Sequence, residues 1–287
     1  MTDLGSALGE TVIFLYEREG RIPLGTGFVV GYPILDGKEQ VVPLVVTAKH
    51  VIGDERMVVG RFTTHSADRP LMVEYDLQGM RSSGDLWEHQ DEGVDIVVFR
   101  SPHFQEAKYA PLPLDLLASK ERMASEDVKT TDRVIFPSML VSFMGTSRNY
   151  PVVRDGSIAL IPDELVPLKF NVGQKSIETK QQVLLIDTLA IQGASGSPVF
   201  LWPGPRLKGN AFAIGGTRPL LLGIMHAFYL AIPRDISQAA VSTGRLSFSE
   251  NAGIAIVFPA WRLLEILESK ELRSRIMALT KTEEAGG

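Results

Sequence analysis

Three residues of this chain have side chains of the types that acyl transfer to a serine requires. Ser195 lies in a glycine-rich turn at 193–198, which reads GASGSP, while His50 and Asp95 border apolar runs further upstream. Such a turn can hold a serine oxygen outward while nearby backbone N–H groups converge on one point, as a nucleophile and its oxyanion hole require. The sequence therefore predicts a catalytic set of His50, Asp95 and Ser195.

Each role follows from the chemistry of the side chain. A serine hydroxyl is a poor nucleophile near neutral pH and needs a base to take its proton. Histidine suits that role because its unperturbed pKa is about 6.5, and a carboxylate on its second nitrogen fixes the tautomer. We expect the backbone N–H groups of Gly193 and Ser195 to form the oxyanion hole, where a glycine allows close approach of the substrate carbonyl.

The order of the three residues separates two classes of hydrolase. α/β-Hydrolases carry the order Ser, Asp, His, whereas this chain has His50, then Asp95, then Ser195. Ser197 also replaces the last glycine of the G-x-S-x-G elbow of that fold. The chain is therefore not expected to be an α/β-hydrolase.

Many short β-rich runs, separated by Gly, Pro, Asp and Ser, must position these residues. Many short strands separated by such turn residues indicate a sandwich or barrel architecture. The polar segment 81–92 is expected to form a surface loop, and a helix is expected to begin at Pro259. The expected strands are 11–16, 27–31, 40–47, 56–62, 71–75, 95–99, 133–136, 140–145, 156–161, 183–187, 196–201, 219–228 and 253–258.

Short motifs along nearly the whole chain resemble those of the trypsin-like serine peptidases of bacterial type, which have the chymotrypsin fold (peptidase clan PA). Val97 and Ala194 stand where that family usually has a small and a polar residue. Because position 194 carries no acid, the zymogen switch in which a freed N-terminus pairs with that acid is not expected. The matching motifs are GTGF at 25–28, TAKH at 47–50, VDIV at 94–97, GASGSP at 193–198, LGIMH at 222–226 and NAGIAI at 251–256.

The resemblance implies an all-β fold with two six-stranded antiparallel β-barrels and a C-terminal α-helix. The N-terminal barrel would span 8–127 and carry His50 and Asp95. The C-terminal barrel would span 128–258 and carry Ser195, with the helix at 259–283 packed on it. A substrate is expected in the cleft between the two halves.

By the same resemblance, two short segments would wall the pocket for the residue before the scissile bond. Neither segment contains an acid, so a preference for Lys or Arg is not expected, and an apolar pocket is. Phe228 lies where a glycine often keeps that pocket open, and would narrow its entrance. The expected wall residues are Leu189, Ala190, Ile191, His226, Ala227 and Phe228.

Composition and charge limit the class of partner and compartment. The chain has 287 residues, 45% of them hydrophobic and 22% charged, with a formal net charge of −5. Nothing in this composition indicates a nucleic-acid-binding protein, which would usually show a basic patch or domain. There is no cysteine, which is compatible with any compartment and only removes the disulfide argument for secretion. Neither a signal peptide nor an apolar membrane span is visible, so a cytoplasmic location without membrane association is expected.

No metal-ligand pattern occurs, so neither a metal nor another cofactor is expected. The other histidines differ in their surroundings. His65, His89 and His103 lie in polar or proline-flanked segments and are expected on the surface. His226 lies on the strand that would line the cleft, where a core or cleft-wall role is favoured over catalysis.

Together these features predict a serine endopeptidase that acts on protein or peptide substrates through a covalent acyl-enzyme. Two alternatives stay open. One is a catalytically silent trypsin-like fold used as a protein-binding module, and the other is an esterase with the same triad. A regulatory protein partner is also left open.

Overall fold

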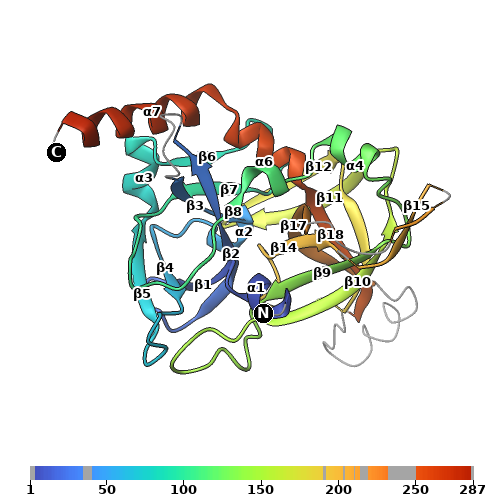
Figure 1. Cartoon of the computed structure of the whole chain (residues 1–287), viewed down its shortest axis with the longest axis horizontal. Coiled ribbons are helices and arrows are strands. Elements are labelled where there is room, and N and C mark those ends of the chain that lie inside the picture. The colour runs from blue at the N-terminus through green and yellow to red at the C-terminus, as the bar shows by residue number, and fades with distance from the viewer. Residues whose placement is uncertain are drawn as a thin grey trace, which may run out of the picture.

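The computed structural model describes residues 4–34, 41–189, 192–202, 204–209, 211–213, 219–231 and 250–285. Two β-rich halves lie side by side, the first drawn mainly in blue and cyan and the second in green to orange (Figure 1). Most helices are short, and the longer ones follow the last strand. This confirms the predicted all-β fold class with helical structure at the C-terminus.

The first half is a sheet of eight strands in the order β5-β4-β1-β2-β3-β7-β6, with β8 added to β2 in parallel. Among the described strands, the outer strands β5 and β6 are not paired with each other. The sheet is therefore a half-barrel, which differs from the closed six-stranded barrel expected here. Its strands are β1 (Val12–Glu17), β2 (Pro23–Pro33), β3 (Val41–Thr47), β4 (Met57–Phe62), β5 (Leu71–Asp76), β6 (Leu86–Glu88), β7 (Val97–Arg100) and β8 (Leu112–Pro113).

The second half is a closed antiparallel barrel in the order β10-β13-β18-β17-β14-β9. This matches the six-stranded barrel expected from the sequence. Its strands are β9 (Arg133–Ser138), β10 (Val152–Leu160), β13 (Leu184–Asp187), β14 (Pro198–Leu201), β17 (Leu220–Ala231) and β18 (Glu250–Pro259).

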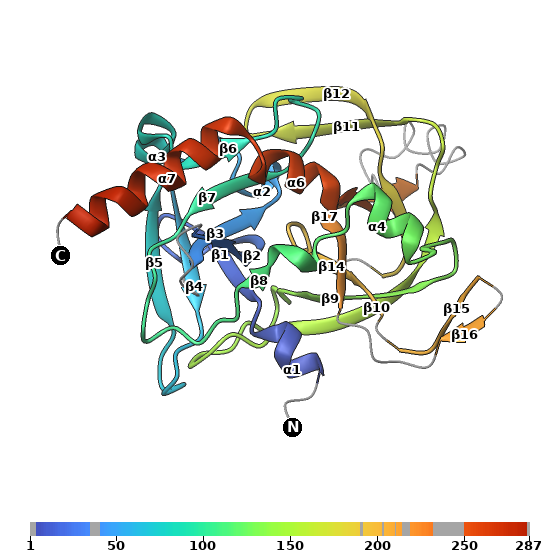
Figure 2. The same cartoon turned by 45° about the horizontal axis from the view of Figure 1, so that its top comes forward.

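Two hairpins and several helices complete the fold. The hairpin β11–β12 extends from the barrel to the end of the first sheet, where β11 contacts α2 (Figure 2). The hairpins pair β11 (Val166–Val172) with β12 (Lys175–Gln181) and β15 (Arg206–Lys208) with β16 (Ala211–Ala213). The helices are α1 (Leu4–Gly9), α2 (Lys49–Ile52), α3 (Leu77–Ser83), the 3-10 turn η1 (Leu114–Leu116), α4 (Lys120–Ser125), α6 (Ala260–Leu267) and α7 (Lys270–Ala285).

Side-chain alternation explains which faces of the strands are buried. In β5, Val73 and Tyr75 are buried while Glu74 is exposed, as the two-residue period of a half-buried strand requires. The central strand β3 is buried on both faces from Pro43 onward. One hydrophobic cluster contains residues of both halves, including Val46 and Phe258, so burial of apolar surface holds the halves together.

Two of the sequence-based expectations about local structure are wrong. The segment 140–145 forms turns instead of a strand, because the Arg61 guanidinium binds the carbonyls of Met144 and Gly145 at 2.9 and 2.8 Å. The segment 81–92 contains the end of α3 and strand β6. Trp87 of β6 is buried opposite Val98, which a largely polar sequence does not reveal.

The C-terminal helical region consists of two helices. α6 packs on β17 and β18, whereas α7 continues over α3 and β6 of the first half (Figures 1 and 2). Arg275 of α7 binds Asp85 at 3.0 and 2.9 Å, and Arg100 binds the same carboxylate at 3.1 Å. The expected packing on the second half therefore describes α6 only. Within the described chain, no helix is both long and apolar enough to cross a membrane.

Candidate active site

His50 and Asp95 meet because the two strands that border them are paired. β3 and β7 are antiparallel, with Thr47 opposite Val97. The residues that follow β3 therefore lie beside the residues that precede β7. α2 is a single turn that directs His50 toward this junction.

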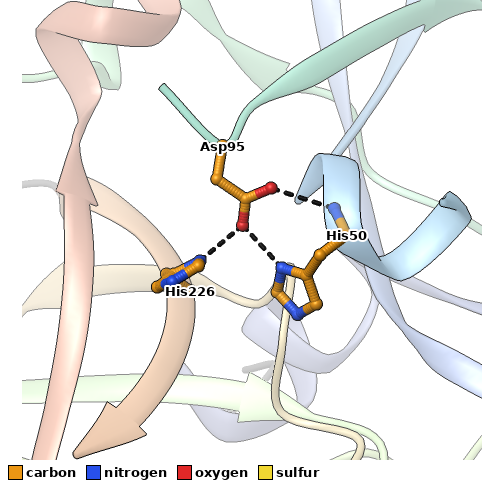
Figure 3. A group of neighbouring side chains, drawn as sticks. All are labelled: His50, Asp95 and His226. Atoms are coloured by element: carbon orange, nitrogen blue, oxygen red, sulfur yellow. Dashed lines mark hydrogen bonds and ion pairs between the residues drawn. The ribbon is translucent and has the colours of Figure 1, made fainter. Parts of the chain in front are cut away.

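The carboxylate of Asp95 holds His50 at two atoms. Its Oδ1 accepts the backbone N–H of His50 at 2.9 Å, and its Oδ2 lies 2.6 Å from His50 Nδ1 (Figure 3). Asp95 is 1% exposed, and the side chain of His50 is 22% exposed. The imidazole is thus oriented by a buried carboxylate, and its Nε2 points away from Asp95 (Figure 3).

The electrostatics of the pair favour an ionised Asp95. Burial by itself would raise the pKa of Asp95, but the charge of His50 and the hydrogen bonds from His226 and His50 hold that pKa well below its usual range. Burial by itself would lower the pKa of His50, and the charge of Asp95 together with its hydrogen bond outweighs this and raises the pKa above its ordinary value.

The loop before Asp95 is braced from two sides. From α2, the buried Lys49 donates its Nζ to the Glu92 carbonyl at 2.7 Å. From the β11–β12 hairpin, Gln181 donates to Asp91 Oδ2 at 2.8 Å. The hairpin, which the sequence did not predict, therefore helps to place the carboxylate.

Ser195 lies in the loop that leads into β14, between two glycines with positive φ. Gly193 has φ +96° and Gly196 has φ +83°, a region that favours glycine. A Cβ on Gly196 would overlap the Thr26 carbonyl and the Thr47 hydroxyl, so the loop lies against the first half. The glycines on both sides of the serine are thus required by this conformation.

Thr26 of β2 holds this loop from the other half of the molecule. Its backbone N–H donates to the Ser195 carbonyl at 2.9 Å, and its hydroxyl donates to the Gly193 carbonyl at 2.7 Å. The same hydroxyl accepts the N–H of Met139 at 2.9 Å. Among the described residues, the N–H groups of Gly193 and Ser195 donate to no backbone acceptor.

The Ser195 hydroxyl donates to the backbone carbonyl of His226 at 2.9 Å. Between the described side chains of Ser195 and His50 there is no hydrogen bond in this arrangement. The structure brings His50 and Asp95 into direct contact, and it links Ser195 to them through residue 226.

His226 is buried, as a core role requires, but its contact with Asp95 was not predicted from the sequence. It was expected in the core or in the pocket wall, and it is 3% exposed with its Nδ1 2.5 Å from Asp95 Oδ2 (Figure 3). Its ring makes edge contacts with the rings of His50, Phe170 and Phe258, at centroid distances of 5.1, 4.8 and 5.4 Å. The sequence signal for this contact was the position of His226 at the end of the motif 222–226, which follows the motif that contains Ser195.

The ring nitrogens of His50 and His226 and the carboxylate of Asp95 are also a set of donors that a divalent metal could use, since one atom from each lies within 4.8 Å of the others. Ligands of a tetrahedral ion are separated by about 3.3 Å when each bond is about 2.0 Å long. The 2.5 and 2.6 Å separations are instead hydrogen-bond distances. Hydrogen bonding accounts for this cluster without an ion.

The expected pocket is described only in part. The Leu189 side chain is 67% exposed, and Ala227 is half-buried. Ala190, Ile191 and the side chain of Phe228 lie outside the described part of the chain. The preference for an apolar residue therefore stays a prediction.

The three other histidines lie away from this cluster. His65 and His103 are exposed, as expected for surface residues. His89 is half-buried, and its Nε2 lies 2.6 Å from Glu265 Oε2 on α6.

Comparison with solved structures identifies the architecture. The crystal structure of the MamO protease domain from Magnetospirillum magneticum, in its apo form, matches 93% of this chain and 100% of that domain, with a TM-score of 0.53 and 12% identity. This chain has the fold of the trypsin-like serine peptidases. The HtrA-type protease AlgW with a decapeptide matches 94% of this chain and 66% of that protein, with a TM-score of 0.47 and 12% identity.

No protein-family model matches the sequence, and no curated protein matches it. One fold can carry many functions, so the likeness to solved structures establishes the trypsin-like architecture alone. A functional conclusion has to come from the geometry of the site.

Proposed function

We propose that this trypsin-like chain is a serine endopeptidase in which His50, Asp95 and Ser195 form the catalytic triad. The observation that carries the proposal is the two-point contact of Asp95 with the backbone N and the Nδ1 of His50. A proton on Nδ1 that is held by the carboxylate leaves Nε2 as the basic nitrogen. A general base of this kind is what a serine nucleophile needs.

In the proposed reaction, the Ser195 hydroxyl leaves the His226 carbonyl and gives its proton to His50 Nε2 as Oγ attacks the peptide carbonyl. The N–H groups of Gly193 and Ser195 stabilise the oxyanion that forms. The His50 imidazolium then protonates the leaving amine, and an acyl-enzyme results. Water, deprotonated by His50, then attacks the ester carbonyl, and the His50 imidazolium gives this proton to Ser195 Oγ as the acid product leaves.

The Thr26 contacts support an oxyanion loop that is ordered without an activating N-terminus. Ala194 is 2% exposed, and its methyl side chain offers no carboxylate with which an N-terminal amine could pair. The two carbonyls that flank it in the loop, those of Gly193 and Ser195, are both bonded to Thr26. Preorganised donors of this kind lower the barrier without reorganisation during the reaction.

A second candidate function is a catalytically silent binding module. The observation that favours it is the Ser195 hydroxyl, which is directed to the His226 carbonyl and not to His50. Catalytic hydrogen bonds often form only when substrate is bound, so this geometry is also compatible with an active peptidase. An esterase would use the same residues, and a comparison of peptide and ester substrates separates it from a peptidase.

Labelling with a fluorophosphonate, followed by mass spectrometry of the modified peptide, tests the proposal. We expect covalent modification of Ser195 and its loss in His50→Ala. His65→Ala is the matched control, because His65 is exposed and its backbone N–H donates to the Glu106 carbonyl, outside the cluster. Absence of labelling in the folded wild-type protein, together with no hydrolysis of a peptide library, would support the silent module.

A further inference from the structure

Asp95 lies in a hairpin that the C-terminal helices contact at both ends. β6 and β7 pair in antiparallel fashion, with Glu88 opposite Val97, and Asp95 lies in the connection 89–96 between them. α6 packs on β17 and β18 of the second half, and α7 crosses β6 of the first half (Figure 2). The hairpin in one half is therefore bordered by helices that begin in the other half.

At the base of the hairpin, the contact is an ion pair with α7. Asp85 precedes β6, and its backbone carbonyl accepts the N–H of Arg100, the last residue of β7, at 2.9 Å. Arg275 donates Nε to Asp85 Oδ1 at 3.0 Å and Nη2 to Oδ2 at 2.9 Å, a two-point contact that fixes direction as well as distance. Burial by itself would raise the pKa of Asp85, but hydrogen bonds from Arg275, Arg100 and Ser83 lower it to about 2, so the carboxylate is ionised.

At the other end, His89 joins the connection to α6. Its Nδ1 accepts the N–H of Asp91 at 2.9 Å, and its Nε2 lies 2.6 Å from Glu265 Oε2. Because Nδ1 accepts a hydrogen bond, the neutral ring carries its own hydrogen on Nε2 and donates it to Glu265. Asp91 Oδ1 in turn accepts the N–H of Gly93 at 2.8 Å. A path of hydrogen bonds therefore runs from α6 to the segment that leads into Asp95.

Between these two contacts the boundary is open. A cavity of about 970 Å³ lies between the hairpin and the helices, lined by residues 86–90 on one side and by Glu265, Ile266 and residues 268–271 on the other. Apolar packing, which has no preferred direction, is interrupted there. The two polar contacts are therefore the interactions that can fix how the hairpin is oriented on the helices.

We propose that α6 and α7 clamp the hairpin that carries Asp95. Glu265 of α6 is a positioning residue that acts through His89. Arg275 of α7 is a second one that acts through Asp85. The catalytic consequence of the clamp rests on the proposed peptidase function, whereas its effect on the hairpin does not. Charged side chains that only added stability would change the Tm and leave the titration of the candidate base unchanged.

The direction of the effect follows from the contact between Asp95 and His50. Burial by itself would lower the pKa of His50, and the charge and hydrogen bond of Asp95 outweigh this. A hairpin that is held less firmly lets the carboxylate leave the position that makes this contact, so the His50 titration should move to lower pH. A misplaced acid also orients the base less well, which lowers kcat without removing a substrate contact.

The test removes each contact in the whole chain. Glu265→Ala loses the acceptor for His89, and Arg275→Gln loses the two-point contact with Asp85. For both variants we expect a fall in kcat of about tenfold, with little change in KM. We also expect an NMR titration of His50 that is shifted to lower pH, and faster hydrogen exchange of the amides in 89–96. If Arg275→Gln does not fold, Arg275→Lys takes its place, because it keeps the charge and loses the two-point contact.

Matched variants separate the clamp from a general loss of charge. Glu268→Ala removes an exposed carboxylate that lines the same cavity, and Arg273→Gln removes an exposed guanidinium from α7. Both should behave as the wild-type protein does. Glu265→Gln keeps an oxygen that can accept the His89 hydrogen, so it should recover most of the kcat that Glu265→Ala loses.

The clamp and the proposed function fail in different measurements. Unchanged His50 titrations and unchanged exchange in both Glu265→Ala and Arg275→Gln would overturn the clamp, as would equal shifts in Glu268→Ala and Arg273→Gln. If the wild-type protein neither reacts with a fluorophosphonate nor cleaves peptides, the peptidase proposal fails. The titration and exchange measurements on the same variants still decide whether the helices hold the hairpin.

Discussion

The backbone N–H of Thr26, in the first half of the molecule, donates to the carbonyl of Ser195, in the second half, at 2.9 Å. The Thr26 hydroxyl extends this contact to Gly193 and Met139. A single buried threonine therefore links the half that carries the predicted base to the loop that carries the predicted nucleophile.

Replacing the Thr26 hydroxyl should weaken both the loop and catalysis. Thr26→Val keeps the shape but leaves the Met139 N–H and the Gly193 carbonyl without their partner, at a cost of about 1–3 kcal/mol in the free energy of unfolding. We expect kcat/KM to fall by about tenfold or more because the oxyanion donors are less well fixed. Thr11→Val is the control, since it removes an equally buried hydroxyl bond to Leu8 away from the site. A similar loss of kcat/KM in both variants would contradict the assigned role.

Ser195→Ala should abolish peptide hydrolysis and fluorophosphonate labelling while the protein stays folded. Ser197→Ala is the control two residues away, because the Ser197 hydroxyl is fully buried and has no hydrogen-bond partner among the described residues. Its removal should leave activity in place and cost little stability. Rates and thermal melting of both variants check this, and an inactive Ser197→Ala beside an active Ser195→Ala would show that the wrong serine was chosen.

Activity should fall at low pH as His50 becomes protonated. Because the pKa of His50 is raised, the pH at which kcat/KM falls to half of its maximum should lie above about 6.5, the unperturbed pKa of histidine. The charged group that raises the pKa of His50 is Asp95. The acids Glu88, Asp91 and Glu92 act on the neighbouring Lys49 instead. A kcat/KM profile that is flat between about pH 5 and pH 9 would contradict the role of His50 as base.

Asp95→Asn should reduce kcat by about four orders of magnitude, because an amide can hold the imidazole in the wrong tautomer. The depressed pKa of Asp95 contributes stability that is present above the unfolded value of about 3.9 and is lost as the pH falls below it. Thermal melting between pH 3 and pH 7 should therefore be less pH-dependent in the variant. An unchanged kcat would rule out Asp95 as the partner of His50.

Prolonged treatment with a chelator should leave peptide hydrolysis intact. The cluster of His50, Asp95 and His226 is held at hydrogen-bond distances, so its geometry does not depend on an ion. Activity measured before and after treatment with EDTA checks this. Reversible loss that zinc or calcium restores would show that the cluster binds a metal that catalysis needs.

Cleavage should follow small or medium apolar residues such as Ala, Val, Leu or Met. The pocket segments contain no carboxylate, and an unpaired cation buried there would be costly. Phe228→Gly should admit larger aromatic residues if Phe228 narrows the entrance. A peptide-library profile measures both effects, and cleavage mainly after Lys or Arg would show that an acid reaches the pocket from another loop.

The sequence by itself determined the all-β architecture and the location of the predicted base and acid at strand ends. Short β-rich apolar runs and the turn residues between them are local signals, so strands such as β3 and β7 were predicted to within a few residues. The pairing of these strands then brings His50 and Asp95 together. Their catalytic roles, and that of Ser195, stay predictions.

Only the tertiary structure decided which distant groups complete the site. The β-bulge at His226, where the register between β17 and β18 shifts, depends on how β17 pairs with its neighbours, and the bonds of Thr26 depend on how the two halves pack. The β11–β12 hairpin and the path of α7 across the first half likewise depend on partners far away in the chain, such as Asp91 and Asp85. Local periodicity carries no information about a partner that lies a hundred residues away, because long-range contacts are selected by packing and by the need to satisfy buried polar groups.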